Sequence, residues 1–341
     1  MKKVIYIFKV LFLLSMLYAC KPSNEYKIVW SHYTGWEPWA YAQKAGILEK
    51  WAKKYNIKIK LELVEYITSI NLYNAKKYWA CPMTNMDALT LPAASGVDST
   101  ALIIGDFSNG NDGIVAKKQK SIKQLKGQKI NLVQYSVSHY LLSRALEMNG
   151  LKEKDVKLIN SKENDLGNLF VSNPKGVAVT WNPILMKIAK TKDAKMLFDS
   201  SKIPGEIIDM MVVRSDAPES LKKALVGAWY ETMKVMKSKK AMEFMAKNSG
   251  ATVKEFKKQL ETTRMFYTAK EAAAFAKDDK LKKTMEYVRT FSHSKGLFGK
   301  GASKDFVGIE FPDGSIIGDK NNVKLRFNSK YMEMAAKGEL K

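Results

Sequence analysis

A stretch without basic residues is the chemically most informative part of this 341-residue chain. The chain carries 57 Lys and Arg residues, yet the segment Tyr78–Ala116 has none and contains four acids: Asp87, Asp98, Asp106 and Asp112. Buried strands also avoid Lys, but a buried carboxylate without a partner is costly, so core formation does not explain the acids. The pattern predicts an acidic ligand-binding face. Asp residues that only cap helices or form turns are the alternative.

Other candidate ligand contacts lie where expected strands end. Asp87 and Asp106 each follow a buried strand, and Asn85 lies just before Asp87. Carboxylates beside aromatic faces suit a small planar cation, through charge-assisted hydrogen bonds and cation–π contact. The remaining candidates are aromatic, imidazole, amide, hydroxyl or acidic side chains in neighbouring segments: His32, Tyr33, Trp36, Asn109, Asp112, Ser136, Ser138, His139, Trp181, Asn182 and Glu206.

Several of these candidates have an ordinary structural alternative. The Ser138 hydroxyl and the N–H groups beside it suit an anion or a carbonyl oxygen, but Ser138 can equally be an N-cap. The glycine-rich bend at 109–113 is a hinge, a cleft lining or a tight turn. The cation interpretation assigns two aromatic walls and three acceptors: Trp36, Trp181, Asp87, Asp106 and Glu206.

Alternating strands and helices must position these side chains. The expected strands are 26–33, 57–66, 80–84, 101–106, 129–133, 156–159, 176–181 and 207–213. The expected helices are 36–55, 69–78, 138–149, 165–171, 183–191 and most of 218–291. Such alternation predicts an α/β fold in which helices cover parallel sheets.

The order of these elements predicts two lobes. A second series of strands and helices starts after residue 116, and strand 207–213 returns toward the first lobe. Two crossovers can hinge around a cleft, where the carboxyl ends of the strands meet a ligand. We expect lobe 1 to comprise 26–116 and 214–341, and lobe 2 to comprise 117–213.

The first 25 residues indicate export and lipidation. Residues 1–19 hold three Lys, no acid and a short apolar run, which is the layout of a signal peptide. The run is shorter than the ~20 apolar residues of a membrane-spanning helix. Leu17-Tyr18-Ala19-Cys20 resembles a bacterial lipobox, so we expect lipidation at Cys20 and a tether at 20–25. The mature protein would be exported and anchored to the membrane, facing the periplasm or the cell exterior.

Five long segments resemble one family of transport proteins. They are SHYTGWEPWAYAQKAGI (31–47), MTNMDALTLPAASGVDSTALIIGDFSNGNDGI (83–114), VSHYLLSRALEMNGL (137–151), VTWNP (179–183) and DSSKIPGEIIDMMVV (199–213). These segments are similar to solute-binding proteins of ABC transporters of the nitrate/sulfonate/taurine type. The similarity is strongest to a subgroup whose genes lie beside urea carboxylase, an enzyme class associated with guanidine breakdown.

The resemblance implies a type II periplasmic-binding-protein fold, with two lobes that close on a small nitrogen-containing solute. Guanidinium or a urea-like compound is the implied solute, and a nitrate-, sulfonate- or taurine-type anion is the alternative. An ABC permease and its ATPase are the implied partners. The same fold is found in a pyrimidine-precursor synthase of thiamine biosynthesis, which is the enzyme alternative. A member of that enzyme family is expected to carry a cysteine-rich motif.

Catalytic and cofactor motifs are missing from the sequence. The chain has three histidines, Cys81 as its one cysteine beyond Cys20, no zinc-type spacing, no phosphate-cradling loop and no nucleophile elbow. We therefore expect a protein without enzymatic activity, cofactor or metal. We also expect it to be a monomer. The net charge of +23 is compatible with a nucleic-acid partner. The expected export, and the lack of aromatic residues interspersed among the basic ones to stack on bases, argue against such a partner. We expect the Lys side chains on solvated outer faces of helices.

Overall fold

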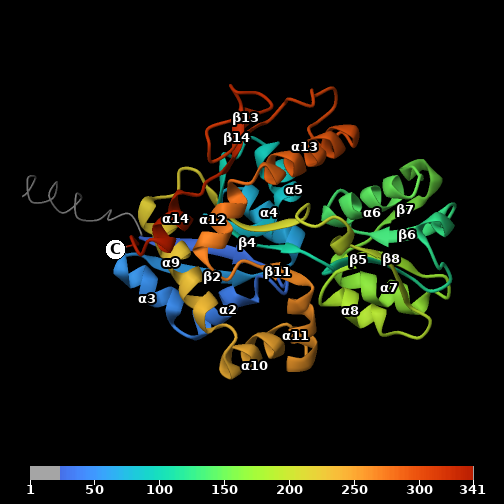
Figure 1. Cartoon of the computed structure of the whole chain (residues 1–341), viewed down its shortest axis with the longest axis horizontal. Helices are drawn as coiled ribbons and strands as arrows, with labels where there is room; N and C mark the ends of the chain where they lie inside the picture. Colours follow the sequence, from blue (N-terminus) through green and yellow to red (C-terminus); the bar gives the residue numbers. More distant parts are fainter. Residues whose placement is uncertain (1–23, 341) are drawn as a thin grey trace, which may run out of the picture.

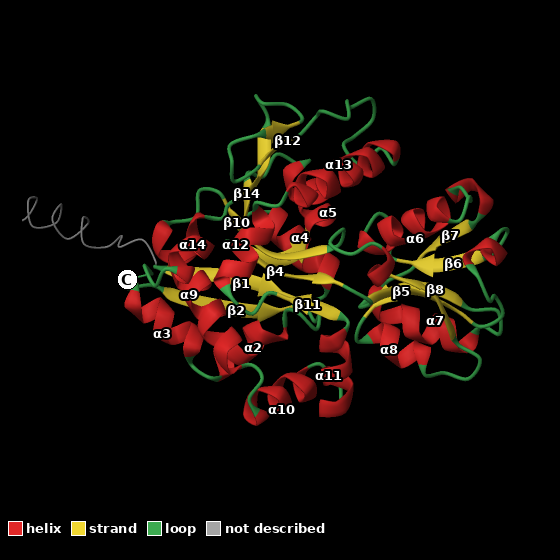
Figure 2. Ribbon diagram, viewed as in Figure 1, coloured by secondary structure: helices red, strands yellow, loops and turns green. Residues whose placement is uncertain are grey.

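The structure, a computed structural model, describes residues 24–340. The expected signal peptide at 1–19 and the expected lipidation site Cys20 lie outside the described residues. Within residues 24–340 the chain forms two lobes, each with its own β-sheet and packed helices (Figures 1 and 2). In this part of the chain, no helix has the length and apolar character needed to cross a bilayer.

Lobe 1 contains the larger sheet. Its strands are β1 (Glu25–Trp30), β2 (Lys58–Leu63), β3 (Ala80–Thr84), β4 (Ser99–Ser108), β10 (Ile208–Arg214), β11 (Thr263–Met265), β12 (Gly308–Glu310), β13 (Ile316–Ile317) and β14 (Val323–Phe327). The strand order is β13-β12-β14-β4-β10-β3-β1-β2, and β11 pairs with β4. β1 is parallel to β2 and β3, whereas β10 is antiparallel to both β3 and β4.

The sequence of each strand matches its place in this sheet. β3 (ACPMT) and β10 (IDMMVVR) are central and almost continuously apolar, as expected for strands with both faces covered. β2 (KIKLEL) alternates polar and apolar residues and lies at the sheet edge, with one face toward solvent. Because both faces of β10 are covered, a charged side chain in the buried part of this strand is unusual.

Lobe 2 repeats this arrangement with fewer strands. They are β5 (Asp112–Ala116), β6 (Lys129–Leu132), β7 (Lys157–Asn160), β8 (Val177–Trp181) and β9 (Lys195–Asp199). The strand order is β7-β6-β8-β5-β9, with β5 antiparallel to β8 and β9 and with β6 parallel to β7 and β8. In each sheet, the strand that follows a connection between the lobes is antiparallel to both of its neighbours. This strand is β10, between β3 and β4, in lobe 1, and β5, between β8 and β9, in lobe 2.

Helices cover both sheets. Lobe 1 has α2 (Glu37–Lys44), α3 (Ile47–Lys54), α4 (Tyr66–Asn74), α5 (Asn85–Ala88), α9 (Glu219–Val235), α10 (Lys239–Asn248), α11 (Val253–Glu261), α12 (Ala269–Ala276), α13 (Asp279–Ser294) and α14 (Lys330–Ala336). Lobe 2 has α6 (Val137–Met148), α7 (Leu166–Ser172) and α8 (Ile184–Ala189). Short helical turns occur at Leu89–Ala93, Ile122–Leu125, Glu153–Asp155, Glu163–Asp165 and Ser200–Lys202.

The two connections between the lobes lie earlier in the chain than expected. One connects β4 to β5 at residues 109–111, and the other connects β9 to β10 at residues 200–207. β5 therefore belongs to the second sheet and β10 to the first, and the expected boundaries after 116 and after 213 are displaced. The first boundary is displaced because β5 directly follows a glycine-rich bend and was not expected as a strand. The second is displaced because hydrophobic patterning identified β10 without indicating which sheet it joins. The connections touch each other, with Ser108 Oγ and Ser200 Oγ 2.7 Å apart.

Some expected elements differ in the structure. The expected helix 36–55 is divided into α2 and α3, because Gly46 adopts a left-handed conformation with φ of 73°. The expected helical region 218–291 holds α9 to α13 but also β11. The strands β5, β9, β12, β13 and β14 were not expected. They are short or partly exposed, so they lack the long apolar runs that identify buried strands.

Close packing of α3 against α9 gives the first prediction. A Cβ atom at Gly227 in α9 would lie 2.2 Å from the Trp51 ring of α3. We expect Gly227→Ala to lower the free energy of unfolding by about 1–3 kcal/mol, because the two helices must move apart. Urea denaturation measures this change. Gly167→Ala in α7, where a Cβ atom meets nothing within 4 Å, is the matched control and should not destabilise the protein; equal losses in both variants would contradict the packing argument.

Candidate functional site

Strand pairing brings acidic residues together at one edge of the lobe 1 sheet. β3 and β4 end at this edge, and the antiparallel β10 begins there. Asp209 on β10 is paired with Thr84 on one side and with Asp106 on the other. Two carboxyl groups from distant parts of the sequence are therefore neighbours in adjacent strands.

The Asp106–Asp209 pair is buried and only partly satisfied. Tyr33 Oη donates to Asp106 Oδ1 over 3.2 Å, whereas no N–H group or hydroxyl donates to Oδ2 of Asp106 or to Oδ2 of Asp209. The two carboxyl groups lie within hydrogen-bonding reach of each other. Burial raises the pKa of Asp106 to about 7. Burial, together with the Asp106 charge, raises the pKa of Asp209 well above its ordinary value. Gly35 allows close approach here, since a Cβ atom at this residue would lie 2.2 Å from Asp106 Oδ2.

Asp87 lies in α5, directly after β3. Its Oδ2 accepts hydrogen bonds from Tyr66 Oη at 2.6 Å and from Thr84 Oγ1 at 2.9 Å, while its buried Oδ1 has no hydrogen-bond partner in the protein. Burial raises the pKa of Asp87 to about 6, against the opposing effect of Tyr66, Thr84 and the backbone N–H of Val137. Val137 is the first residue of α6, so Asp87 of lobe 1 lies against the N-terminus of a lobe 2 helix.

Asp112, the first residue of β5, adds a carboxyl group from lobe 2. Burial raises its pKa to about 7, with a further contribution from the Asp87 charge. We call Asp87, Asp106, Asp112 and Asp209 the acidic cluster. The groups that shift these pKa values most are carboxyls, tyrosines, hydroxyls and a backbone N–H, with no Lys, Arg or His among them. Among the described residues, no three Asp, Glu, His or Cys side chains form a group that could hold a metal ion.

A row of aromatic side chains runs past the acidic cluster from one lobe to the other. The ring centroids of Tyr33 and Trp36 are 5.0 Å apart, those of Trp36 and Tyr66 are 5.5 Å apart, and those of Tyr66 and Trp181 are 5.7 Å apart. We call these four residues the aromatic row. Trp181 ends β8 and is the strand partner of Asp112, so the row meets the acidic cluster in lobe 2 as well. The buried Nε1 of Trp36 has no hydrogen-bond acceptor in the protein.

Lobe 2 and the first connection contribute further unpaired polar atoms. Ser138 Oγ in α6 and Thr180 Oγ1 in β8 are buried without a partner. Asn111 Nδ2 donates to Thr263 Oγ1 over 2.7 Å, but Asn111 Oδ1 is unpaired. The N-cap of α6 is Ser136, whose Oγ accepts from the Ser138 backbone N–H, so the capping alternative applies to Ser136 and leaves the Ser138 hydroxyl without a structural role.

Glu206 has protein partners that compete with the role expected for it. Its carboxylate accepts from Tyr140 Oη at 2.5 Å, from Arg144 Nε at 2.9 Å and from Arg144 Nη2 at 3.1 Å. Both oxygens are therefore engaged by α6 of lobe 2. We correct the expectation that Glu206 is a free acceptor, because an Arg–carboxylate pair with two contacts is already a strong interaction.

Five other expected contacts also have partners within the protein. His32 Nδ1 is 2.6 Å from Glu37 Oε1, and His139 Nε2 is 2.8 Å from Glu153 Oε2. Two of the others use their side-chain amides locally: Asn85 Nδ2 donates to the Glu206 carbonyl oxygen, and Asn182 Oδ1 accepts from Met186 N–H. The backbone N–H of Asn109 donates to the Thr262 carbonyl oxygen. These residues border the acidic cluster without the unpaired atoms that distinguish it.

Three residues of this region were missed by sequence reasoning: Tyr66, Thr180 and Asp209. Asp209 had a signal, because it is a lone acid within the apolar run 207–213, which is the same kind of signal that identified Asp106. Glu206, three residues earlier, was chosen instead. Tyr66 and Thr180 had no signal, since a tyrosine at the start of a helix and a threonine in a strand are common core residues.

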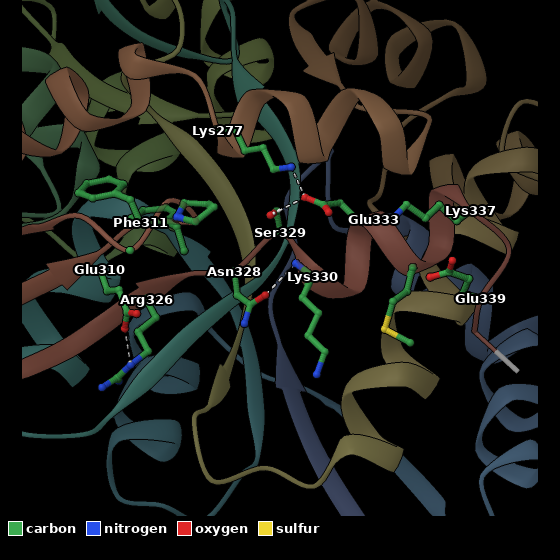
Figure 3. A pocket seen from close by; sticks show the side chains of 14 residues that line it. Lys277, Glu310, Phe311, Arg326, Asn328, Ser329, Lys330, Glu333, Lys337 and Glu339 are labelled. Atoms are coloured by element: carbon green, nitrogen blue, oxygen red, sulfur yellow. Dashed lines mark hydrogen bonds and ion pairs between the residues drawn. The ribbon is translucent and has the colours of Figure 1, made fainter.

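A hollow of about 590 Å³ lies beside β14 and α14 in lobe 1 (Figure 3). Its charged side chains pair with one another: Lys277 with Glu333, and Arg326 Nε with Glu310 Oε2 at 3.0 Å. The acidic cluster is the opposite case, because its carboxyl groups have no cationic partner. For this reason we take the acidic cluster and the aromatic row as the candidate functional site.

The comparisons with known proteins agree with this architecture. A family model described as NMT1/THI5 like matches residues 83–228, which is less than half of the chain. No curated protein sequence matches the chain. Among solved structures, the chain is similar to the alkanesulfonate-binding protein SsuA from Xanthomonas axonopodis pv. citri, with 14% identity over 83% of this chain and 96% of that one and a TM-score of 0.65.

Two further structures extend the comparison. The periplasmic aliphatic sulphonate binding protein SsuA from Escherichia coli has 17% identity over 80% of this chain and 93% of that one, with a TM-score of 0.65. The CA3427 gene product of Candida albicans, described as having the generic periplasmic binding protein structural fold, has 15% identity over 80% and 93%, with a TM-score of 0.62. At these identities the likeness establishes the fold: the chain has the two-lobe, type II periplasmic-binding-protein fold expected from its sequence.

The acidic cluster gives a prediction about pH and stability. An Asp whose pKa is raised on folding binds more protons in the native state, so its contribution to stability is lost as pH rises through the range between its unfolded and folded pKa values. Asp209→Asn removes one such group. We expect the ligand-free variant to melt a few degrees above the wild type at pH 8, by about 2–4 °C for each kcal/mol gained, and near the wild type at pH 5.

Thermal melts at the two pH values test this expectation. Asp98→Asn is the matched control, because Asp98 is partly exposed and pairs with Arg326. An Asp209→Asn variant that is less stable than the wild type at pH 8 would show that the Asp209 carboxylate is compensated in the native protein.

Proposed function

We propose that this protein is an extracytoplasmic solute-binding protein of an ABC importer, and that it captures a small nitrogen-rich cation such as guanidinium between its two lobes. The observation that carries the proposal is the acidic cluster: buried carboxyl groups from both lobes without a basic partner. A bound cation would supply the missing charge. A planar cation would also use the faces of the aromatic row.

The unpaired acceptor atoms match the donors of such a cation. Asp87 Oδ1, Asp106 Oδ2 and Asp209 Oδ2 are buried and lack a donor in the protein. Guanidinium carries N–H groups that point outward in its own plane and form strong hydrogen bonds to carboxylates. Asp87, Asp106 and Asp209 are the proposed acceptors, and Trp36 and Trp181 are the proposed aromatic walls.

A urea-like solute is favoured by one further atom. Trp36 Nε1 is a buried donor without an acceptor, and guanidinium has no acceptor to offer it. A carbonyl oxygen on the solute would accept this hydrogen bond. Guanidinium and urea therefore differ in how they would use the same site, and Trp36 distinguishes them.

An anionic solute is the alternative, since two of the similar structures are named as sulfonate-binding proteins. The N-terminus of α6 with the Ser138 hydroxyl is the place that would suit an anion. Asp87 lies against that helix end, and four carboxyl groups nearby would repel an anion unless each were protonated. The local charge therefore favours a cation.

The remaining parts of the proposal rest on the sequence and the fold. Two lobes joined by two connections suit closure around a solute, and an exported solute-binding protein requires a permease and its ATPase. The signal peptide at 1–19, lipidation at Cys20, membrane anchoring and a monomeric state belong to the same proposal. A function without catalysis is proposed as well, because two of the similar structures are named as binding proteins.

Calorimetric titration at pH 8 with guanidinium, urea, nitrate and taurine tests the proposed solute class. We expect saturable binding of guanidinium and no binding of nitrate, because the acidic cluster is more ionised at pH 8 than at pH 6. Asp87→Asn should weaken guanidinium binding about 10- to 100-fold through loss of a charge-assisted hydrogen bond. Asp98→Asn is the control, because Asp98 lies in the same Lys-free segment but is paired with Arg326. This variant should leave binding unchanged. Nitrate or taurine binding without guanidinium binding would overturn the cation proposal.

Trp36→Phe separates the two nitrogen compounds. The variant keeps an aromatic face but loses the unpaired indole N–H. We expect urea binding to fall about five- to tenfold, the size of one hydrogen bond to a neutral group, and guanidinium binding to change less than about twofold. A large loss for guanidinium with none for urea would contradict the assigned role of Trp36.

A further inference from the structure

The Asp106–Asp209 pair has a property beyond the choice of solute. The two residues are strand partners, both are buried, and each has an Oδ2 atom that no protein donor reaches. Two adjacent carboxylates in a site without a cation repel each other, so one of them holds a proton at neutral pH. The raised pKa values of Asp106 and Asp209 agree with this geometry.

The groups that face the pair do not relieve this repulsion. The loop after β1 supplies the Tyr33 hydroxyl, β5 supplies Asp112, and the segment after β11 supplies Tyr267, whose pKa is raised by burial and by the Asp106 charge. On β11 itself, the Arg264 guanidinium contacts Glu271 at 3.6 Å and its own chain at the Met265 carbonyl oxygen. Asp87 acts on Asp112 from α5. Each facing group is therefore neutral or acidic at the pair.

We propose that the site exchanges protons for its cation: binding of a guanidinium-type solute ionises the Asp106–Asp209 pair and releases protons to the solvent. This inference rests on the proposed function and adds a regulatory property to it. A cation bound next to the two carboxyl groups takes over the compensating role of the proton. The released proton leaves Asp106 or Asp209 and passes to buffer, and the solute keeps its own protons because guanidinium remains charged throughout the physiological range.

Proton exchange makes the affinity depend on pH in a defined direction. Below the pKa values of the ligand-free site, each displaced proton makes the affinity rise about tenfold per pH unit. With a pKa of about 7 for Asp106 and a pKa raised well above its ordinary value for Asp209, guanidinium affinity should increase from pH 5 to pH 8 and level off only where both groups are ionised without the solute. A neutral solute such as urea does not ionise the pair, so its affinity should not rise over this interval.

Calorimetry of the wild-type protein in two buffers of different ionisation enthalpy tests the proposal. At pH 6, guanidinium binding should release about one proton, seen as a difference in apparent enthalpy between the buffers, and the release should be smaller at pH 9. Asp209→Asn should reduce the number of protons released at pH 6 and flatten the dependence of affinity on pH, whereas Asp98→Asn should change neither.

The outcomes distinguish this inference from the proposed function. Guanidinium binding without proton release, at an affinity independent of pH between 5 and 8, would overturn the inference and leave the proposed function standing. Failure of guanidinium to bind at any pH would overturn both. Infrared spectra of the ligand-free protein give a second readout, because the C=O stretch of a protonated carboxyl group should persist at pH 6–7 and weaken in Asp209→Asn. Loss of that band on addition of guanidinium would support the exchange directly, and its absence at pH 6 would count against it.

Discussion

Burial of acidic groups without a basic partner is the constraint on which the rest of this molecule depends. A carboxylate removed from water needs a hydrogen-bond donor or a positive charge, and otherwise it takes up a proton. Asp106 and Asp209 are such carboxyl groups and are paired in adjacent strands, and Asp112 lies near them from the other lobe. A solute that supplies positive charge relieves the constraint, and the aromatic row next to it offers flat faces on which a planar cation can lie.

The architecture brings this constraint about. Each sheet contains one strand that is antiparallel to both of its neighbours, β10 in lobe 1 and β5 in lobe 2. Each of these strands begins where the chain enters its lobe from the other one. Asp209 and Asp112 stand at the starts of these two strands. Ion pairs farther out, between Arg144 and Glu206 and between Lys190 and Glu255, connect the lobes around the site. Two basic side chains thus form ion pairs at the lobe contacts, whereas the acidic cluster has no basic partner.

The net charge of +23 and the acidic site are compatible because they lie in different places. Many Lys side chains lie on exposed positions of helices, for example Lys239 at the start of α10 and Lys53 in α3. Exposed charges interact weakly with a buried site, since water and salt screen them. Total charge therefore says little about the solute, whereas the charge of one buried segment says much.

The sequence by itself determined the α/β class, the two-lobe plan and the Lys-free segment that holds Asp87, Asp106 and Asp112, because apolar runs and missing cations are local properties of the chain. Tertiary structure alone decided that Asp209 pairs with Asp106 and that Arg144 engages Glu206. Strand order and register are set by contacts between residues about a hundred positions apart, which no local pattern encodes. For the same reason, β10 was expected as a strand while the sheet that it joins became clear only from its pairing, and β5 was not expected as a strand at all.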